Sequence, residues 1–258
     1  MSQSSALITG ASTGIGFELA RILAREGNNL ILVAKSSERL KLAADKIRKE
    51  FPSIQCETLE ADLASSSAPV KLADAIRAKN WNVDILVNSA GYGDFGSFLE
   101  TSLEKELQMM QLNMVTLVHL TKLFVKGMTE RKRGRILNVA STAAFQPGPF
   151  MAIYYASKAF VLSFSEALNN ELKGTGVSVT ALCPGPTESN FTKAANLEGN
   201  KLFKSGVMDA RAVAEVGYRG LMSSKSVVIP GLRNRVLASA VRFMPRDLVT
   251  QFSRKAVN

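Results

Sequence analysis

The chain has 258 residues, of which 46% are hydrophobic and 21% are charged. These proportions exclude a mainly disordered or fibrous protein, and the length suffices for one large α/β domain with a substantial core. Basic residues outnumber acidic residues by 32 to 22, which gives a net charge of +10. The excess lies mainly in residues 201–258, which hold eleven basic residues against Asp209, Glu215 and Asp247.

The hydropathy pattern predicts neither a membrane-spanning nor a secretory segment. The longest apolar runs, such as residues 30–34 and 83–87, are far shorter than the ~20 residues that cross a bilayer. Residues 1–5 are polar, and no apolar signal segment follows them. Cys56 and Cys183 stand far apart and indicate neither a disulfide framework nor a metal pair. We therefore expect a cytoplasmic protein that binds no metal.

Short aliphatic and β-branched runs alternate with helical patterns along the chain. The runs cover residues 6–9, 29–34, 54–60, 84–88, 135–140, 177–183 and 226–229. Continuous apolar runs of this kind are typical of strands buried on both faces of a parallel sheet. Helical periodicity is clear at residues 15–26 and 38–50, and a longer helix is expected at 101–132. The alternation predicts a Rossmann-like, doubly wound sheet of about seven strands with helices on both faces.

No linker interrupts this alternation, so we expect one domain over residues 1–230. The less regular stretch at residues 185–205 follows a strand and is expected to form a lid over a site at the carboxyl ends of the strands. Residues 231–258 form a basic, amphipathic C-terminal extension.

The turn after the first strand, residues 9–16, reads Thr-Gly-Ala-Ser-Thr-Gly-Ile-Gly and leads directly into a helix. Glycines let the backbone approach a pyrophosphate, whose charge is met by free N–H groups at the helix N-terminus. A glycine cluster alone also occurs in ordinary strand-to-helix turns, but its place before the first amphipathic helix favours dinucleotide binding.

This spacing, Gly-x-x-x-Gly-x-Gly, resembles the cofactor turn of the short-chain dehydrogenase/reductase family, and further segments match that family in order. They are Asp62 after the third strand, Asn88-Ser89-Ala90-Gly91 after the fourth, Ser141 after the fifth, Tyr154 and Lys158 in Tyr-x-x-x-Lys, and Pro184-Gly185-Pro186-Thr187 after the sixth. Ser89 replaces the second Asn of the family's Asn-Asn-Ala-Gly. The resemblance covers residues 9–187 and implies binding of a nicotinamide cofactor. The expected cofactor-binding residues are Gly10, Ser12, Thr13, Gly14, Ile15, Gly16, Lys35, Ser36, Asp62, Leu63, Asn88, Ala90, Gly91, Tyr154, Lys158, Pro184, Gly185 and Thr187.

The resemblance also implies a catalytic group of Ser141, Tyr154, Lys158 and Asn113. Tyr-x-x-x-Lys places both side chains on one helix face, where a lysine ammonium favours the phenolate and lets Tyr154 exchange a proton. Ser141 would hold the substrate oxygen by a hydrogen bond. Asn113 matches, by a single residue, an Asn whose helix distortion supports a water chain to the lysine. Tyr155 is expected to pack in the interior or to line the pocket, and the only histidine, His119, is expected to be structural.

The second strand ends with Lys35-Ser36-Ser37 instead of an acidic residue. A lysine and two hydroxyls would neutralise and hydrogen-bond a 2′-phosphate, which favours NADP(H) over NAD(H). Lysine lacks the planar fork of arginine, so discrimination would be softer. An NADP(H) enzyme of the cytosol is expected to reduce a carbonyl to an alcohol.

Aromatic residues in the loops after the fourth to sixth strands are the predicted substrate pocket. They are Tyr92, Phe95, Phe145, Phe150 and Phe191, with Phe98, Pro149 and Phe203 as further candidates. Arginine and histidine are absent from the pocket-forming loops up to Thr192, which favours an apolar carbonyl substrate.

The extension at residues 231–258 is expected to form two short helices separated at Pro245. It would pack on the domain or on a partner subunit, or lie on an anionic membrane surface. Nucleic-acid binding is not expected, because no binding motif accompanies the basic residues. By resemblance, the helices that hold Asn113 and Tyr154 would form the interface of a homodimer or homotetramer.

Two other functions remain open at this point. A non-enzymatic NADP(H) sensor on the same scaffold would not need Ser141, Tyr154 and Lys158 together. A sugar-nucleotide epimerase or dehydratase shares Tyr-x-x-x-Lys, but the chain after Pro184 leaves little room for a nucleotide-sugar lobe.

Overall fold

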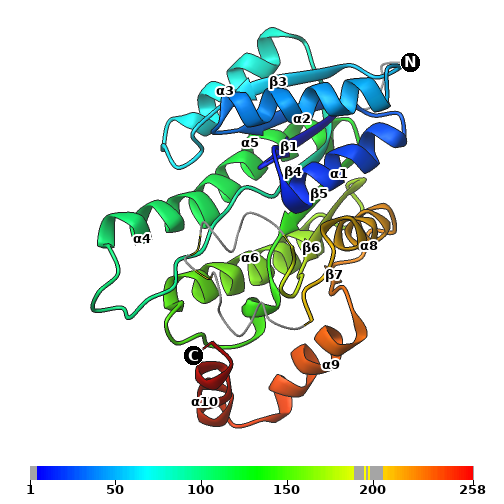
Figure 1. Cartoon of the computed structure of the whole chain (residues 1–258). Coiled ribbons are helices and arrows are strands. Elements are labelled where there is room, and N and C mark those ends of the chain that lie inside the picture. The colour runs from blue at the N-terminus through cyan, green and yellow to red at the C-terminus, as the bar shows by residue number, and fades with distance from the viewer. Residues whose placement is uncertain (1–4, 189–194, 196, 198–205, 258) are drawn as a thin grey trace.

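The computed structural model describes residues 5–188, 195, 197 and 206–257. Seven parallel strands form one sheet in the order β3-β2-β1-β4-β5-β6-β7 (Figure 1). The strands are β1 (Ser5–Thr9), β2 (Asn29–Ala34), β3 (Cys56–Glu60), β4 (Val83–Asn88), β5 (Gly134–Val139), β6 (Val177–Leu182) and β7 (Val227–Val228). This confirms the predicted doubly wound α/β architecture.

Helices cover both faces of the sheet. They are α1 (Gly14–Arg25), α2 (Ser37–Glu50), α3 (Ala68–Ala78), α4 (Leu103–Met110), α5 (Leu117–Glu130), α6 (Ala152–Glu171), α8 (Ala210–Met222), α9 (Leu232–Ala240) and α10 (Arg246–Val257). The α1, α2 and α8 helices bury their apolar stripes in one core cluster with residues of β1 and β2. The α3 and α5 helices do the same in a second cluster on the opposite face. None of the helices in the described part of the chain is long and apolar enough to cross a membrane.

Several predicted boundaries differ from the structure for identifiable reasons. The strand expected at residues 226–229 pairs only at Val227 and Val228, because it is the short edge strand β7. The predicted fifth and sixth strands extend one residue beyond β5 and β6, to Ala140 and Cys183. These two residues still pair with the neighbouring strands, through hydrogen bonds of 2.8 Å from Ala140 N to Leu182 O and from Cys183 N to Val228 O. The long helix expected at residues 101–132 is interrupted by a π-helical segment, η1 (Gln111–Thr116).

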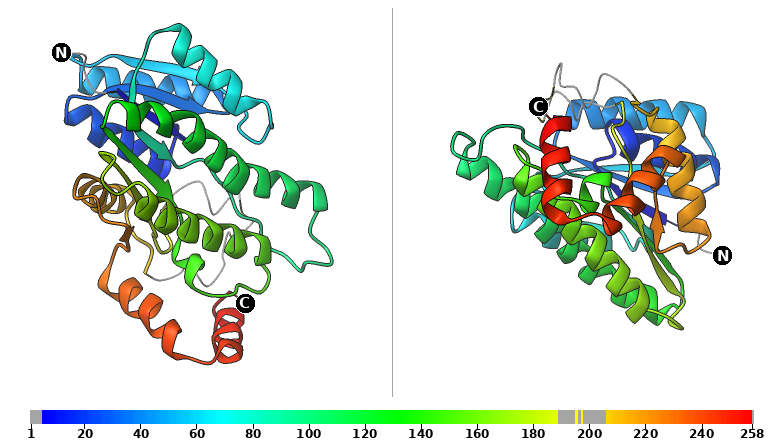
Figure 2. Two further views of the ribbon diagram at one scale, coloured as in Figure 1. Left: turned by 180° about the vertical axis from the view of Figure 1, so that it is seen from behind. Right: turned by 90° about the horizontal axis from the view of Figure 1, so that it is seen from below.

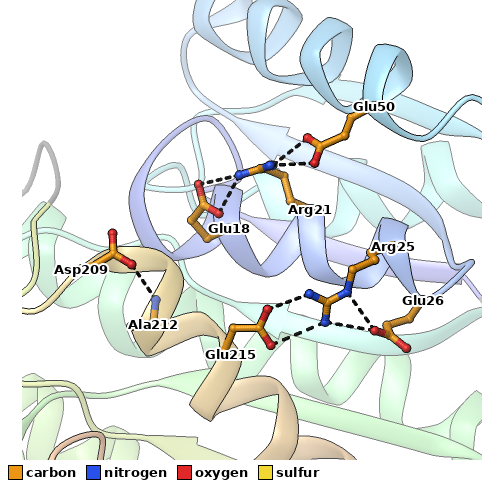
Figure 3. Close-up of polar contacts among 8 residues, drawn as sticks. All are labelled: Glu18, Arg21, Arg25, Glu26, Glu50, Asp209, Ala212 and Glu215. Carbon is orange, nitrogen blue, oxygen red and sulfur yellow. Dashed lines mark hydrogen bonds and ion pairs between the residues drawn. The ribbon is translucent and has the colours of Figure 1, made fainter.

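Two arginines of α1 connect this helix to both of its neighbours, as Figure 3 shows. Arg21 pairs with Glu50 at the end of α2 at 2.7 Å, and Arg25 pairs with Glu215 of α8, also at 2.7 Å. These pairs are partly exposed, so each contributes at most about 1 kcal/mol. The buried apolar stripes of α1 therefore supply most of the stabilisation that holds the first turn of this helix in place.

The C-terminal extension departs from the layered core. After β7 the chain forms α9, a 3₁₀ turn η4 (Val241–Phe243) and α10, and Pro245 separates the last two elements as expected. Figures 1 and 2 show α9 and α10 projecting away from the sheet and its flanking helices.

Candidate active site

A cleft of about 1160 Å³ lies at the carboxyl ends of the strands. Strand order reverses there, because β1 and β4 are neighbours in the sheet although β2 and β3 lie between them in sequence. In doubly wound sheets this crevice is where ligands bind. The predicted site residues that line the cleft are Gly10, Ser12, Thr13, Gly14, Ile15, Gly16, Lys35, Ser36, Asp62, Leu63, Ala90, Gly91, Tyr92, Ser141, Tyr154, Lys158, Pro184, Gly185 and Thr187.

The glycine turn has the backbone geometry that an anion requires. Gly10 and Gly14 adopt positive φ angles of 66° and 59°, which disfavour other residues. A Cβ atom on Gly10 would lie 2.9 Å from the amide nitrogen of Ala90, so the turns after β1 and β4 can touch only if residue 10 is glycine. Within the described chain, the Thr13 side chain makes no capping hydrogen bond to α1, and the first turn of the helix holds no acidic residue. The amide groups at the start of α1 are therefore open to a phosphate.

Asn88, predicted to bind the cofactor, lies beneath the cleft and does not line it. Its Nδ2 donates to Asn138 Oδ1 at 2.9 Å and to Thr121 Oγ1 at 3.2 Å, which ties β4 to β5 and α5. Thr9 supports the same turn, since its Oγ1 accepts hydrogen bonds from the amides of Ser89 and Ala90 at 3.0 and 3.1 Å. Asn88 and Thr9 thus position the backbone that faces the cleft, because the side chain of the last strand residue points into the core.

Ser141, Tyr154 and Lys158 meet in the cleft, as predicted. Ser141 lies two residues after the end of β5, and its Oγ accepts a hydrogen bond of 3.1 Å from Ala143 N. Tyr154 and Lys158 lie one turn apart on α6, with Lys158 Nζ 5.7 Å from the centre of the Tyr154 ring. The ammonium group donates a hydrogen bond of 2.9 Å to the carbonyl oxygen of Val139, the last residue of β5. The end of β5 and one face of α6 therefore bring the three side chains together.

Burial shifts the pKa values of two of these groups in opposite directions. It raises the pKa of the Tyr154 phenol well above its usual range, and the hydrogen bond with Ser141 offsets only part of that rise. Burial also lowers the pKa of the Lys158 ammonium, to about 8. Both shifts favour the neutral form of the buried group. At neutral pH Tyr154 holds its proton, while Lys158 is still mainly charged.

Asn113 lies in the π-helical segment between α4 and α5. Its amide forms two hydrogen bonds with the backbone of Tyr92, from Nδ2 to Tyr92 O at 2.9 Å and from Tyr92 N to Oδ1 at 3.2 Å. Nδ2 also donates to Ser157 Oγ at 3.1 Å. A Cβ atom on Gly91 would lie 2.9 Å from Asn113 Oδ1 and 3.6 Å from Lys158 Nζ. Asn113 thus supports the turn after β4 beside the lysine, and the distortion of the helix is present as the resemblance implied.

At the other end of the cleft, Lys35 and Ser36 follow β2 as predicted, but both already have partners. Lys35 Nζ pairs with Asp62 Oδ2 at 2.7 Å, and this contact holds the pKa of the Asp62 carboxyl below its usual range. Ser36 caps α2 and accepts a hydrogen bond of 3.4 Å from Arg39 N. Arg39 lines the cleft as well. Sequence reasoning missed it, although a basic residue in the first turn of a helix after β2 was a usable signal.

Most of the predicted substrate aromatics do not line the cleft. Phe145 is half-buried and packs against a core cluster that includes Ala140 and Val161. Phe95 and Phe150 pack on one another with ring centres 6.1 Å apart. Phe98 is exposed, and Pro149 does not line the cleft. Phe191 and Phe203 lie outside the described residues. Of these predicted pocket residues, Tyr92 lines the cleft in the described chain. The others were predicted from their position in a loop, which does not show which way a side chain points.

The C-terminal extension forms one wall of the cleft. Its lining residues are Arg233, Asn234, Leu237, Ala238, Ala240, Val241, Met244, Val249, Phe252, Ser253 and Ala256. The approach is close, since a Cβ atom on Gly185 would lie 2.6 Å from Asn234 Nδ2. At α10, the Arg254 guanidinium lies 5.1 Å from the centre of the Phe150 ring. This wall is mainly apolar. It also includes a cation, Arg233, which follows the pocket-forming loops in sequence.

Comparisons with known proteins agree with this geometry. The sequence model of the short chain dehydrogenase family matches residues 4–200. A very-long-chain 3-oxoacyl-CoA reductase of Phaeosphaeria nodorum is 34% identical, over 97% of this chain and 79% of the relative. A protein of the same description from Mycosarcoma maydis is 36% identical over 73% of this chain, and the aligned part spans about half (54%) of that relative.

A solved structure gives the same result. A short-chain dehydrogenase from Sphingobium yanoikuyae in complex with NADPH superposes with a TM-score of 0.83 and 31% identity, covering 93% of this chain and 94% of that one. Residues 4–200, which match the family model, contain the glycine turn, the tyrosine and lysine of α6 and the turn after β6. The chain belongs to the short-chain dehydrogenase/reductase family and is an oxidoreductase of that family.

Proposed function

We propose that the protein uses NADPH to reduce an apolar ketone, of which a long-chain 3-oxoacyl thioester is one class, to the corresponding alcohol. The observation that carries this proposal is the convergence of Ser141, Tyr154 and Lys158 in a cleft that joins an anion-binding turn to an apolar wall. The relatives described as 3-oxoacyl-CoA reductases and the neighbour with bound NADPH support it.

The residues at the two ends of the cleft fit a dinucleotide phosphate. The open amides of Gly14, Ile15 and Gly16 would meet the pyrophosphate, and the close packing of Gly10 on Ala90 leaves room for backbone contact. Lys35 and Arg39 would meet a 2′-phosphate beside the adenosine. The turn of Pro184, Gly185 and Thr187 would hold the nicotinamide end. When bound, the cofactor supplies a hydride.

The chain's own groups would then handle the oxygen and its proton. Ser141 Oγ donates a hydrogen bond to the substrate carbonyl oxygen, where negative charge develops. Tyr154 is protonated at neutral pH because burial raises its pKa, so it is ready to donate its proton to that oxygen. The nearby Lys158 ammonium stabilises the phenolate that remains. The protonated phenol is the form of Tyr154 that a reduction requires.

The test is NADPH oxidation with a series of 3-oxoacyl thioesters and bulky ketones, using Tyr154→Phe and, as a matched control, the neighbouring Tyr155→Phe. Loss of a general acid should lower kcat by about 10²–10⁴-fold in Tyr154→Phe. Tyr155→Phe should change kcat by less than about tenfold, and both variants should bind NADPH as the wild type does. Equal turnover in the wild type and Tyr154→Phe would contradict the proposal, and NADPH binding without turnover would favour the sensor.

A further inference from the structure

The α9 helix and the η4 turn after it present two different faces. Asn234, Ala238 and Val241 lie on the inner face and line the cleft. The outer face carries Leu232, Val236 and Phe243, four and seven residues apart, which is the spacing of one side of a helix. These side chains belong to residues that are 75%, 58% and 88% exposed. An apolar stripe therefore faces water on the back of the cleft wall.

Basic side chains border this stripe, which we call the outer face of α9 (Leu232, Arg235, Val236, Arg242 and Phe243). Arg235 and Arg242 are exposed and seven residues apart, so they follow the same helical direction. Neither takes part in an ion pair within the described chain. The whole extension from residue 231 onward carries six basic residues against one acidic residue, Asp247. The surroundings of the stripe are therefore strongly positive.

We propose that the outer face of α9 docks on an anionic lipid surface. Exposed Leu, Val and Phe side chains flanked by arginines are the pattern of a helix that lies in a bilayer interface, where apolar groups enter the acyl boundary and cations meet lipid phosphates. A second copy of the chain is a poorer occupant, because a two-fold contact would bring the same arginines together and cost repulsion. Charge complementarity thus selects the lipid surface.

Docking at this face would place the cleft beside the lipid, since the same helix forms the cleft wall. An apolar substrate dissolved in the bilayer would then enter the cleft past Leu237 and Met244 without crossing bulk water. This consequence rests on the proposed function, whereas docking itself needs neither cofactor nor turnover.

The experiment is co-sedimentation of the full chain, without cofactor, with phosphatidylcholine vesicles that contain or lack about 30 mol% phosphatidylserine. The variants are V236S/F243S, which removes the apolar contacts, and R235Q/R242Q, which removes the charges. The matched control is Leu42→Ser, because Leu42 on α2 is 56% exposed and far from α9 in sequence. Since none of these residues lines the cleft, turnover of a water-soluble ketone should be equal in all proteins.

The wild type and Leu42→Ser should bind the anionic vesicles and should bind neutral vesicles at least about tenfold more weakly, with binding that decreases as salt rises. Each double variant should lose at least about tenfold in binding to anionic vesicles. Equal sedimentation of wild type and both double variants would overturn the proposal. Failure of the wild type to bind anionic vesicles would also overturn it. A further contrary result would be a change in the molecular mass of V236S/F243S, measured by light scattering, without an effect on vesicle binding; this would identify a second copy as the occupant.

Discussion

At the residue scale, the burial of Lys158, a residue of the proposed reaction, also affects the stability of the fold. Its pKa is about 8 in the folded protein, against about 10.4 for a lysine in an unfolded chain. Between these values the unfolded chain carries a proton that the folded protein has released, so raising the pH favours the folded state. The burial of an ammonium therefore costs stability at neutral pH, and the cost decreases in mildly alkaline solution.

We predict that Lys158→Met removes this pH dependence. The free energy of unfolding of the wild type, relative to the variant, should rise by roughly 1–2 kcal/mol between pH 7.5 and 9.5. Urea unfolding at both pH values measures the difference, and staying below pH 10 limits the ionisation of tyrosines in the unfolded chain. A wild-type advantage that stays constant or falls with pH would show that Lys158 is not desolvated as the structure indicates.

A second prediction at this scale concerns the choice of cofactor. Lys35 pairs with Asp62, whereas Arg39 lines the same part of the cleft and presents a planar guanidinium. Arg39→Gln should raise KM for NADPH by about five- to tenfold while changing KM for NADH little, because a solvent-exposed contact to the 2′-phosphate is lost. Lys46→Gln on the exposed side of the same helix is the control, and an equal effect on both cofactors would remove Arg39 from phosphate recognition.

At the element scale, α10 forms part of the wall of the cleft. Ser253 is buried and lines the cleft, whereas the exposed Gln251 on the same helix does not. A phenylalanine at position 253 would fill the space that a long substrate needs. We predict that Ser253→Phe lowers kcat/KM for the bulkiest ketone by about tenfold or more, as expected when a pocket is overfilled, and leaves the Kd for NADPH unchanged. Gln251→Phe should have no effect, and equal losses in both variants would indicate a general disturbance of α10.

The elements also show what the sequence could and could not predict. Apolar runs such as those of β1 and β4 are buried on both faces, so their pattern alone predicts the parallel sheet. The glycine turn and α6 are local motifs, and their residues indeed line the cleft. The π-helical distortion at Asn113 has no periodic signal of its own and was expected only through the family resemblance.

On the scale of the whole molecule, the features that the sequence did not predict are contacts between segments far apart in the chain. The wall formed by α9 and α10 meets the turn after β6 and the loop before α6, which lie many tens of residues earlier. No local pattern states which way an extension folds back. Packing on the domain was one of the predicted positions of residues 231–258, but their place in the wall of the cleft was not predicted. For the same reason the sequence predicted Phe145 in the pocket, although its half-buried side chain packs against a core cluster.

The central claim for the molecule is hydride transfer from NADPH to a carbonyl in this cleft. The most direct measurement uses NADPH deuterated at one or the other C4 position, the ketone turned over fastest, and mass spectrometry of the alcohol product. The account predicts one deuterium on the carbinol carbon from one C4 epimer and none from the other, because a single cleft fixes one face of the nicotinamide. Product that carries no deuterium with either epimer, although NADPH is bound, would contradict the account.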